Sequence, residues 1–365
     1  MFNFIKTIDR YIIRELFDPF FFGLGAFTAI LSASMILFDL VRAVVVRGMP
    51  MWTAAQVFVY RLPGIAVYIF PMATLLAALL AFGRLSSSSE IVAMKAGGIS
   101  LYRIMAPVLA FGMVVSFVTL LFYEVVVPQA NLSATNLMVQ TGTNRTPRIQ
   151  RNVLIPEIEN DELKRMYFAG SMRGDLMQDV VVQEYSGGKL AQLINAKEAT
   201  YEKEKHTWLF KNGTIYLLSE QGEYKHLIHF KEQYMTVKYS PNDFKISDRK
   251  PEEMNMVELK KFIQLKKKMG EDTLDLWIQY FLKGAIPFSC LVFTLLGAPL
   301  GLSPQRSSSS IGLGLSVLIV FFYYFLTFVS MALGELRLLT PLLSAWLPNF
   351  IVGGVGVYIL YNSAQ

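Results

Sequence analysis

The chain has 365 residues, of which 53% are hydrophobic and 17% are charged, and its formal net charge is +6. A soluble globular protein has about 25% charged residues, so this composition excludes an ordinary soluble protein. Charged residues are sparse over residues 16–127 and 271–365 and dense in between. This pattern indicates a membrane protein with an inserted soluble domain. The positive net charge is attributed to basic residues at helix ends rather than to nucleic-acid binding.

The chain begins with an amphipathic segment, "IKTIDRYIIREL". Its apolar and basic side chains lie on different helical faces, the first set being Ile5, Ile8, Ile12 and Leu16, and the second Lys6, Arg10 and Arg14. This pattern predicts a helix on the membrane surface that leads into the first span. The segment lacks the short apolar region and small-residue cleavage site of a signal peptide.

Six segments have the length of about 20 mostly apolar residues that a transmembrane helix needs. They lie at about 17–40, a stretch ending near residue 82, 102–126, 276–300, 311–333 and 342–361. The second segment begins as early as residue 54 if Pro63 and Pro71 only kink it.

Basic residues in the short loops predict the orientation of these spans. One side has Lys6, Arg10, Arg14, Arg84, Lys95, Arg103 and Arg306, and the other has Arg42, Arg47 and Arg337. Both termini and the loop at 83–100 are therefore expected in the cytoplasm. The polar middle region, about 128–270, is then expected outside the cytoplasm.

The middle region alternates valine-, tyrosine- and isoleucine-rich runs with turn signals such as "SGGK" at 186–189 and "KNGT". Short strands at this spacing predict an all-β sandwich or barrel. The following stretch, "NMVELKKFIQLKKKMG", has an N-cap pair in Asn255 and Glu258 and predicts a short helix. Its apolar side either lies on the outer membrane surface, or the helix simply presents a solvated basic face.

Residues for catalysis or metal binding do not form any known arrangement in this sequence. The histidines show no metal-ligand spacing, Cys290 is the single cysteine, and there is no phosphate-binding loop or hydrolase motif. We expect no catalytic residue, no metal site, no cofactor and no enzymatic activity. Charges in or near the spans are costly and mark candidate functional positions. Lys283 lies in the fourth span, and Arg42 and Arg47 follow the first; each either snorkels to the interface or contributes to a basic collar.

Several stretches, in order along nearly the whole chain, carry a resemblance to a known family. They are "IDRYIIREL", "FPMATLLAALLAFGRLSSSSEIVAMKAGGIS" at 71–100, "MNMVELKKFI", "PFSCLVFTLLGAPLG" at 287–301 and "AWLPN" at 345–349. Together they resemble the permease subunits of the lipopolysaccharide export ABC transporter, the LptF/LptG (YjgP/YjgQ) family. The resemblance implies a helical protein of the inner membrane. It would have a membrane half at 1–127, a periplasmic β-jellyroll at 128–270 and a second membrane half at 271–365.

In that family the loop between spans two and three forms a cytoplasmic coupling helix that docks in a groove of a separate ATPase subunit. The resemblance places this helix at 86–97 and assigns ATPase coupling to Arg84, Glu90, Ile91, Met94 and Gly98. The residue types are compatible with that role. The serines before Glu90 are expected to cap the helix, Ile91, Met94 and Val92 to supply an apolar edge, and Gly97–Gly98 to end it.

The resemblance also implies that basic residues near the outer end of span one contact the phosphates of lipopolysaccharide, with Arg42 and Arg47 as the candidates here. Lys283 of the fourth span is a further candidate because of its charge within a span. The implied partners are an ATPase dimer, a second permease (a paralogue or another copy of this chain), and periplasmic β-jellyroll bridge proteins. The alternative function is a mechanotransmitting ABC permease that moves no lipid, although such proteins usually have four spans. A membrane enzyme acting on lipid-linked glycans lacks catalytic candidates.

Overall fold

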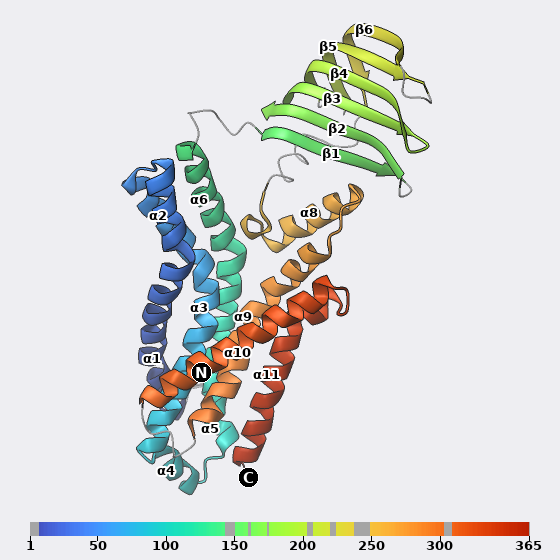
Figure 1. Cartoon of the computed structure of the whole chain (residues 1–365). Helices are drawn as coiled ribbons and strands as arrows, with labels where there is room; N and C mark the ends of the chain where they lie inside the picture. The colour runs from blue at the N-terminus through green and yellow to red at the C-terminus, as the bar shows by residue number, and fades with distance from the viewer. Residues whose placement is uncertain are drawn as a thin grey trace, which may run out of the picture. The chain divides into compact units, whose positions relative to one another are not determined.

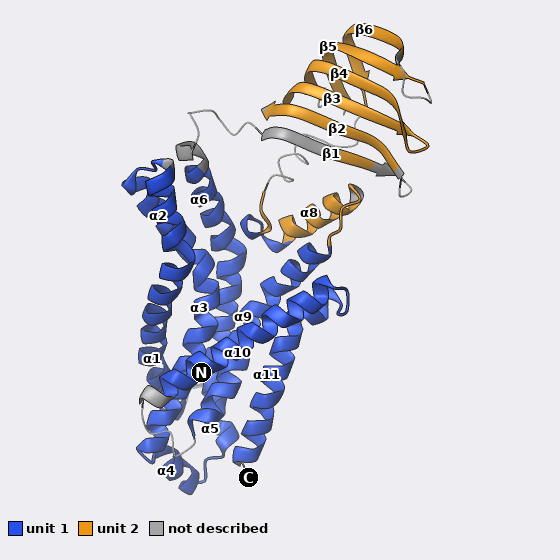
Figure 2. Cartoon of the chain, viewed as in Figure 1, with its two compact units in different colours: residues 1–142, 252–256, 274–365 blue, residues 143–251, 257–273 orange. Residues whose placement is uncertain are grey.

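The computed structural model describes residues 7–142, 150–159, 162–173, 175–202, 207–219, 224–236, 249–302 and 309–364. The chain forms two compact units (Figure 2). Unit 1 comprises Met1–Gly142, Glu252–Met256 and Leu274–Gln365, and unit 2 comprises Thr143–Pro251 and Val257–Thr273. The change from helix to sheet therefore comes later than residue 128, because the chain stays helical up to Gly142.

Unit 1 is helical (Figure 1). In chain order it contains α1 (Thr7–Ser32), the π-helical turn η1 (Ala33–Leu37), α2 (Phe38–Arg47), α3 (Met51–Ser87), α4 (Glu90–Ala96), α5 (Leu101–Leu121), the π-helical turn η2 (Phe122–Val126), α6 (Val127–Gly142), η3 (Pro251–Glu253), α9 (Leu274–Gly301), α10 (Ser309–Glu335) and α11 (Pro341–Ala364). Within the described residues, six helical stretches are long and apolar enough to cross a membrane, which agrees with the six predicted spans.

The helices extend beyond several of the predicted limits. Residues 7–16 form the first turns of α1, and Ile12 and Leu16 are fully buried in the core of unit 1. The apolar side of this amphipathic segment therefore packs against protein, and the segment is continuous with the first span, as predicted. Its place on the membrane surface stays a prediction. Pro63 and Pro71 both lie inside α3, so the longer of the two alternatives for the second span is confirmed.

Helices α3 and α9 form the centre of unit 1, where small residues permit close backbone approach. Ala73, Ala77 and Ala78 of α3 are fully buried. A Cβ atom added at Gly301 of α9 would lie 2.8 Å from the Cβ atom of Phe82 and 2.9 Å from the carbonyl oxygen of Leu79. Contacts between small residues are how membrane helices gain van der Waals packing without a hydrophobic driving force.

Unit 2 contains one antiparallel sheet and one helix. The strands are β1 (Gln150–Glu159), β2 (Glu162–Arg173), β3 (Leu176–Ser186), β4 (Lys189–Glu202), β5 (Thr207–Leu218) and β6 (Tyr224–Met235), and they pair in the order β1-β2-β3-β4-β5-β6. The sheet inserted between the third and fourth spans agrees with the predicted class. Each described strand pairs with its neighbours in the chain, and the strands bend strongly along their length (Figure 1).

The basic helix α8 (Met256–Lys268) packs its apolar side on this sheet. Leu265 and Met269 belong to the same buried cluster as Trp208 and Phe210 of β5. Neither predicted alternative, a helix on the membrane or a fully solvated one, describes this arrangement. The sheet needs an apolar cover, and the alternation of buried and exposed residues along its strands does not reveal from sequence alone which segment supplies it.

Candidate functional site

A short helix, α4 (Glu90–Ala96), lies where the coupling helix is predicted, and its start differs from the prediction. Ser89 occupies the N-cap position with φ of 60°, a left-handed conformation, and its side chain makes no capping hydrogen bond. An N-cap side chain usually needs extended backbone geometry to reach the first amides, so the expectation of a serine cap is wrong. The hydroxyls of Ser87 and Ser88 instead donate to the carbonyl oxygen of Arg84, each at 2.9 Å, at the end of α3.

The end of α4 agrees with the prediction. The amide of Ile99 donates to the carbonyl of Met94 at 3.1 Å, and the amide of Gly98 donates to that of Lys95 at 2.9 Å. This pair of bonds is a Schellman motif, which needs a left-handed residue, and Gly98 has φ of 82°. Gly98 thus fixes the direction in which the chain enters α5.

The carboxylate of Glu90 is held on both oxygens. Its Oε2 atom accepts a hydrogen bond of 2.7 Å from the hydroxyl of Tyr11 in α1. Its Oε1 atom lies 2.9 Å from the hydroxyl of Ser88, whose single proton it shares with the carbonyl oxygen of Arg84. Glu90 is also in the first turn of α4, where a negative charge is favoured by the helix dipole. The first span and the loop between the second and third spans are therefore joined at Glu90.

Two ion pairs tie α1 to the same region. Arg84 at the end of α3 pairs with Glu15, and Arg103 at the start of α5 makes a two-pronged contact with Asp9, at 2.6 and 2.7 Å. Bidentate arginine–carboxylate pairs have a defined geometry as well as charge attraction. No role for Asp9, Tyr11 or Glu15 was predicted from the sequence. The available signal was the presence of two acids in an otherwise basic segment, on the same predicted side as Arg84 and Arg103.

The apolar residues of α4 divide between the core and the surface. Ile91 is 4% exposed and belongs to the core cluster of unit 1, and Met94 is partly buried against the same cluster. Val92 is 65% exposed. The outward apolar edge of α4 is therefore centred on Val92, whereas Ile91 and Met94 seat the helix on its own chain. Lys95 is exposed, and its ammonium lies 3.4 Å from the carbonyl of Ser363 in α11.

The candidate substrate-binding residues lie in different environments. Arg42 is exposed on α2, and Arg47 is the last residue of that helix; the Arg47 side chain lies outside the described part of the structure. Lys283 is only 2% exposed, in α9. Its ammonium donates to the carbonyl oxygen of Met254 at 2.7 Å and lies 4.4 Å from the ring centroid of Tyr123. The ammonium of Lys283 thus has protein partners that differ from the expected lipid phosphates.

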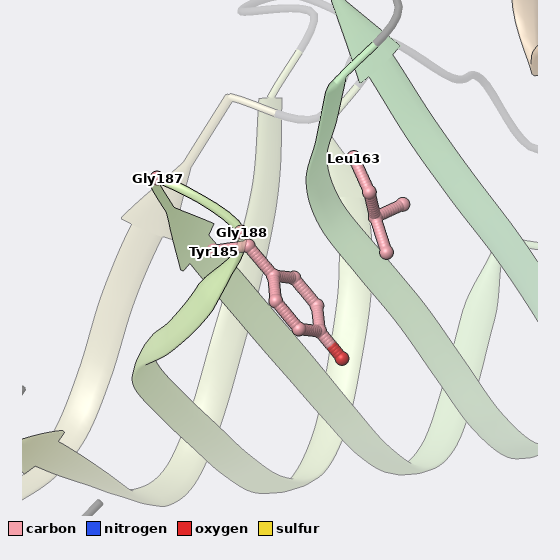
Figure 3. A pocket seen from close by; sticks show the side chains of 4 residues that line it. All are labelled: Leu163, Tyr185, Gly187 and Gly188. Atoms are coloured by element: carbon pink, nitrogen blue, oxygen red, sulfur yellow. The ribbon is translucent and has the colours of Figure 1, made fainter. Parts of the chain in front are cut away.

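A cavity of about 330 Å³ lies at one end of the β3–β4 hairpin and is lined by Leu163, Tyr185, Gly187 and Gly188 (Figure 3). The two glycines form the turn predicted from "SGGK", with φ of 57° and 75°, as a two-residue hairpin requires. The hydroxyl of Tyr185 donates to the amide oxygen of Gln183 at 2.9 Å. This lining has no charged group for a phosphate, so the cavity is not part of the candidate site.

No group of three or more histidine, cysteine or acidic residues suited to hold a metal ion occurs among the described residues.

The described chain combines six apolar helical spans, an antiparallel sheet inserted between the third and fourth spans, and a short helix held between the second and third spans. These features define a multi-pass membrane protein with an inserted β domain.

Residues 10–362 match the model of the family "Lipopolysaccharide export system permease LptF/LptG", and the chain belongs to this family. A curated relative is the lipopolysaccharide export system permease protein LptG of Haemophilus influenzae, which is 24% identical over 295 residues and covers 80% of each chain. At the level of the family, the chain is an ABC-type lipopolysaccharide export permease, hence a transport protein rather than an enzyme. It is a multi-pass protein of the inner membrane with a periplasmic domain.

Proposed function

We propose that this chain is one of two permeases of an exporter that extracts lipopolysaccharide from the inner membrane and passes it through unit 2 to a periplasmic bridge protein. A separate cytoplasmic ATPase dimer supplies the energy by docking on α4. The observation that carries the proposal is the placement of Glu90 at the start of α4, bonded to Tyr11 of the first span, in a chain that matches the permease family from residue 10 to residue 362.

The coupling step uses α4 as the contact with the ATPase. Val92 offers an exposed apolar side chain, Glu90 and Lys95 of the same helix carry charges of both signs, and Arg84 adds a positive charge at the end of α3. An amphipathic helix that inserts its apolar edge in a groove is a common mode of recognition. Ile91, Met94 and Gly98 support this contact by fixing α4 on the chain, so their part in coupling is to set the direction of the helix.

The lipid path uses the apolar surfaces of the first and fifth spans. In each of these two spans only 22% of the most apolar 18-residue stretch is buried against the rest of the chain, compared with 78% in the second span. Exposed phenylalanines cover them, including Phe21 and Phe22 of α1 and Phe321, Phe325 and Phe328 of α10. These surfaces are available for a second permease, either a paralogue or another copy of this chain, and for acyl chains held between the two.

Arg42 and Arg47 are proposed to hold the phosphates of the lipid at the outer end of this apolar path. A contact between an arginine and a phosphate is charge-assisted and frequently bidentate. Lys283 also remains a candidate, although its ammonium already has two protein partners. We therefore place most of the phosphate recognition on the two arginines.

Delivery to the bridge protein is proposed to use an edge of the sheet in unit 2. The last described strand, β6, exposes Leu227, Ile228 and Tyr234. An exposed edge strand presents backbone donors and acceptors that a strand of another protein pairs with readily. The buried cluster of the same sheet, which includes Trp208 and Phe210, offers an apolar interior for acyl chains.

The test is the charge reversal Glu90→Lys together with the truncation Glu90→Ala, in a complex purified with its ATPase and reconstituted in nanodiscs containing lipopolysaccharide. Both variants are expected to lower the amount of bound ATPase or the stimulated hydrolysis rate. The matched control is Glu335→Lys, a change at an exposed glutamate at the end of α10. Unchanged association and hydrolysis in both Glu90 variants would refute the assignment of α4 as the coupling helix.

A further inference from the structure

A short segment of the chain, Glu252–Met256, leaves unit 2 and belongs to unit 1, after which the chain returns to unit 2 in α8. Its neighbours in sequence on both sides, up to Pro251 and from Val257, are parts of unit 2. The segment is deeply enclosed, since Met254 is fully buried and Glu253 is 3% exposed. A five-residue excursion of this kind requires specific contacts, because its backbone groups are removed from water.

Four contacts hold this segment on two different helical spans. On the third span and its extension, Thr135 donates to the carboxylate of Glu253 at 2.7 Å, and Asn131 donates to the carbonyl of Glu252 at 3.1 Å. In η2, the carboxylate of Glu124 accepts the amide of Met256 at 2.8 Å. On the fourth span, Lys283 donates to the carbonyl of Met254 at 2.7 Å.

Lys283 is the central residue of this arrangement. Its ammonium lies 4.4 Å from the ring centroid of Tyr123, so it joins the third span, the fourth span and the segment at one point. Burying an ammonium is costly unless hydrogen bonds and nearby π-electrons compensate. A lysine with this burial and these partners is suited to holding two helices and a backbone in a fixed arrangement.

The fourth span connects this point with the region around α4. Near its other end, α9 approaches the backbone of α3 so closely that a Cβ atom on Gly301 would lie 3.0 Å from the amide nitrogen of Gly83. The carbonyl of Leu302 also accepts a hydrogen bond of 2.9 Å from Ser86. From Lys283 to Gly301 the helix spans about 27 Å at about 1.5 Å per residue. The ends of α3 and α9 are thus in direct contact, the arrangement needed for a displacement of one to reach the other.

We propose that Lys283 and the segment Glu252–Met256 form a clamp by which the third and fourth spans move the chain that enters unit 2, and that Lys283 is a positioning residue for delivery of the lipid. The proposal rests on the export function proposed above. It assigns Lys283 a role in transmitting movement, in contrast to phosphate binding. Its loss is therefore expected to separate ATP hydrolysis from lipid delivery.

The experiment measures amide hydrogen exchange of residues 252–256 in the complete complex, together with ATPase rate, copurified lipopolysaccharide and lipopolysaccharide delivered per ATP hydrolysed. In Lys283→Met, exchange in this segment is expected to rise by about tenfold or more, as the loss of a hydrogen bond to a charged group implies. Delivery per ATP is expected to fall severalfold, while copurified lipid stays near the wild-type amount. Thr135→Val, which changes no charge, is expected to raise exchange and lower delivery per ATP in the same way, by smaller amounts.

The control is Arg61→Met, which removes a positive charge from α3 at a residue whose side chain contacts Asp39 and Met138. It is expected to leave exchange at 252–256 unchanged. Wild-type exchange in both Lys283→Met and Thr135→Val would overturn the clamp, as would wild-type delivery in variants whose exchange has risen. A fall in copurified lipid with unchanged exchange would instead return Lys283 to phosphate binding. If wild-type protein itself neither binds nor delivers lipopolysaccharide, the proposed function fails, whereas the exchange measurement still tests the clamp contacts.

Discussion

The close packing of α9 on α3 leads to a prediction for Gly301→Ala. The added methyl group would lie 2.8 Å from the Cβ atom of Phe82, 2.9 Å from the carbonyl oxygen of Leu79 and 3.0 Å from the amide nitrogen of Gly83. Two of these three atoms belong to the backbone of α3, which cannot move aside as a flexible side chain does. The two helices must therefore separate near the start of the loop that contains α4.

The expected cost is about 1–3 kcal/mol in the free energy of unfolding, the range for an extra methylene group in a well-packed core. For a unit of this size, such a cost lowers the unfolding midpoint by about 2–12 °C. The measurement is thermal unfolding in nanodiscs, followed by ATPase stimulation at a temperature where both proteins are folded. Stimulation is expected to fall as well, because the end of α3 leads directly into α4.

Gly354→Ala in α11 is the matched control, since a Cβ atom there meets nothing within 4 Å. The substitution is expected to be neutral or to stabilise the helix by up to about 1 kcal/mol, because alanine has the higher helix propensity. The reasoning fails if Gly301→Ala and Gly354→Ala unfold at the same temperature, since steric pressure against the backbone of α3 is what distinguishes the two sites.

Three further predictions concern the ends of the spans and the orientation of the chain. Tyr11→Phe removes the 2.7 Å hydrogen bond to Glu90. We expect amide exchange in α4 to rise about two- to tenfold, because one partly exposed hydrogen bond is lost. The control Tyr358→Phe is expected to leave amide exchange in α4 unchanged. A cysteine at Ser186 in a Cys290→Ser background is expected to react with an impermeant thiol reagent in intact spheroplasts, and labelling only after the membrane is opened would reverse the predicted orientation. Arg42→Glu combined with Arg47→Glu is expected to lower lipid photocrosslinking and copurified lipopolysaccharide without loss of assembly. Each partly desolvated contact that is lost weakens lipid binding by about 1.5–3 kcal/mol. Wild-type lipid occupancy would leave acyl-chain burial as the main basis of recognition.

The six spans were predictable because an apolar run of sufficient length has few alternatives in a membrane protein. Their outer limits were not. Residues 127–142, "VPQANLSATNLMVQTG", contain polar side chains that suggested the start of a soluble domain, yet they form α6. The reason is tertiary, since Asn131 and Thr135 bond the distant residues Glu252 and Glu253. From the sequence alone, a polar helical residue that contacts another part of the chain cannot be distinguished from one that contacts water.

The candidate site shows the same division between local and tertiary information. Gly98 could be assigned from sequence because a left-handed residue at a helix end is a local requirement. The role of Ser88 could not be assigned, because the sequence does not show whether its hydroxyl meets the end of α3 or the start of α4. In the structure its single proton is shared between the carbonyl oxygen of Arg84 and the carboxylate of Glu90. Lys283 has partners in Met254 and Tyr123, 29 and 160 residues away along the chain, which no spacing rule connects.

The short length of α4 explains why so many tertiary contacts surround it. Helix α4 has seven residues, and isolated helices shorter than about 12–15 residues are marginal in water. Its position must therefore come from the burial of Ile91 and from the bonds that Glu90 and Lys95 make to α1 and α11. Helix α4 is consequently bonded to the first span through Tyr11, and the end of α3 that precedes it packs on the fourth span at Gly301. Under the coupling role proposed for α4, we therefore expect variants of these attachments to affect ATPase coupling as strongly as variants of the exposed surface of α4.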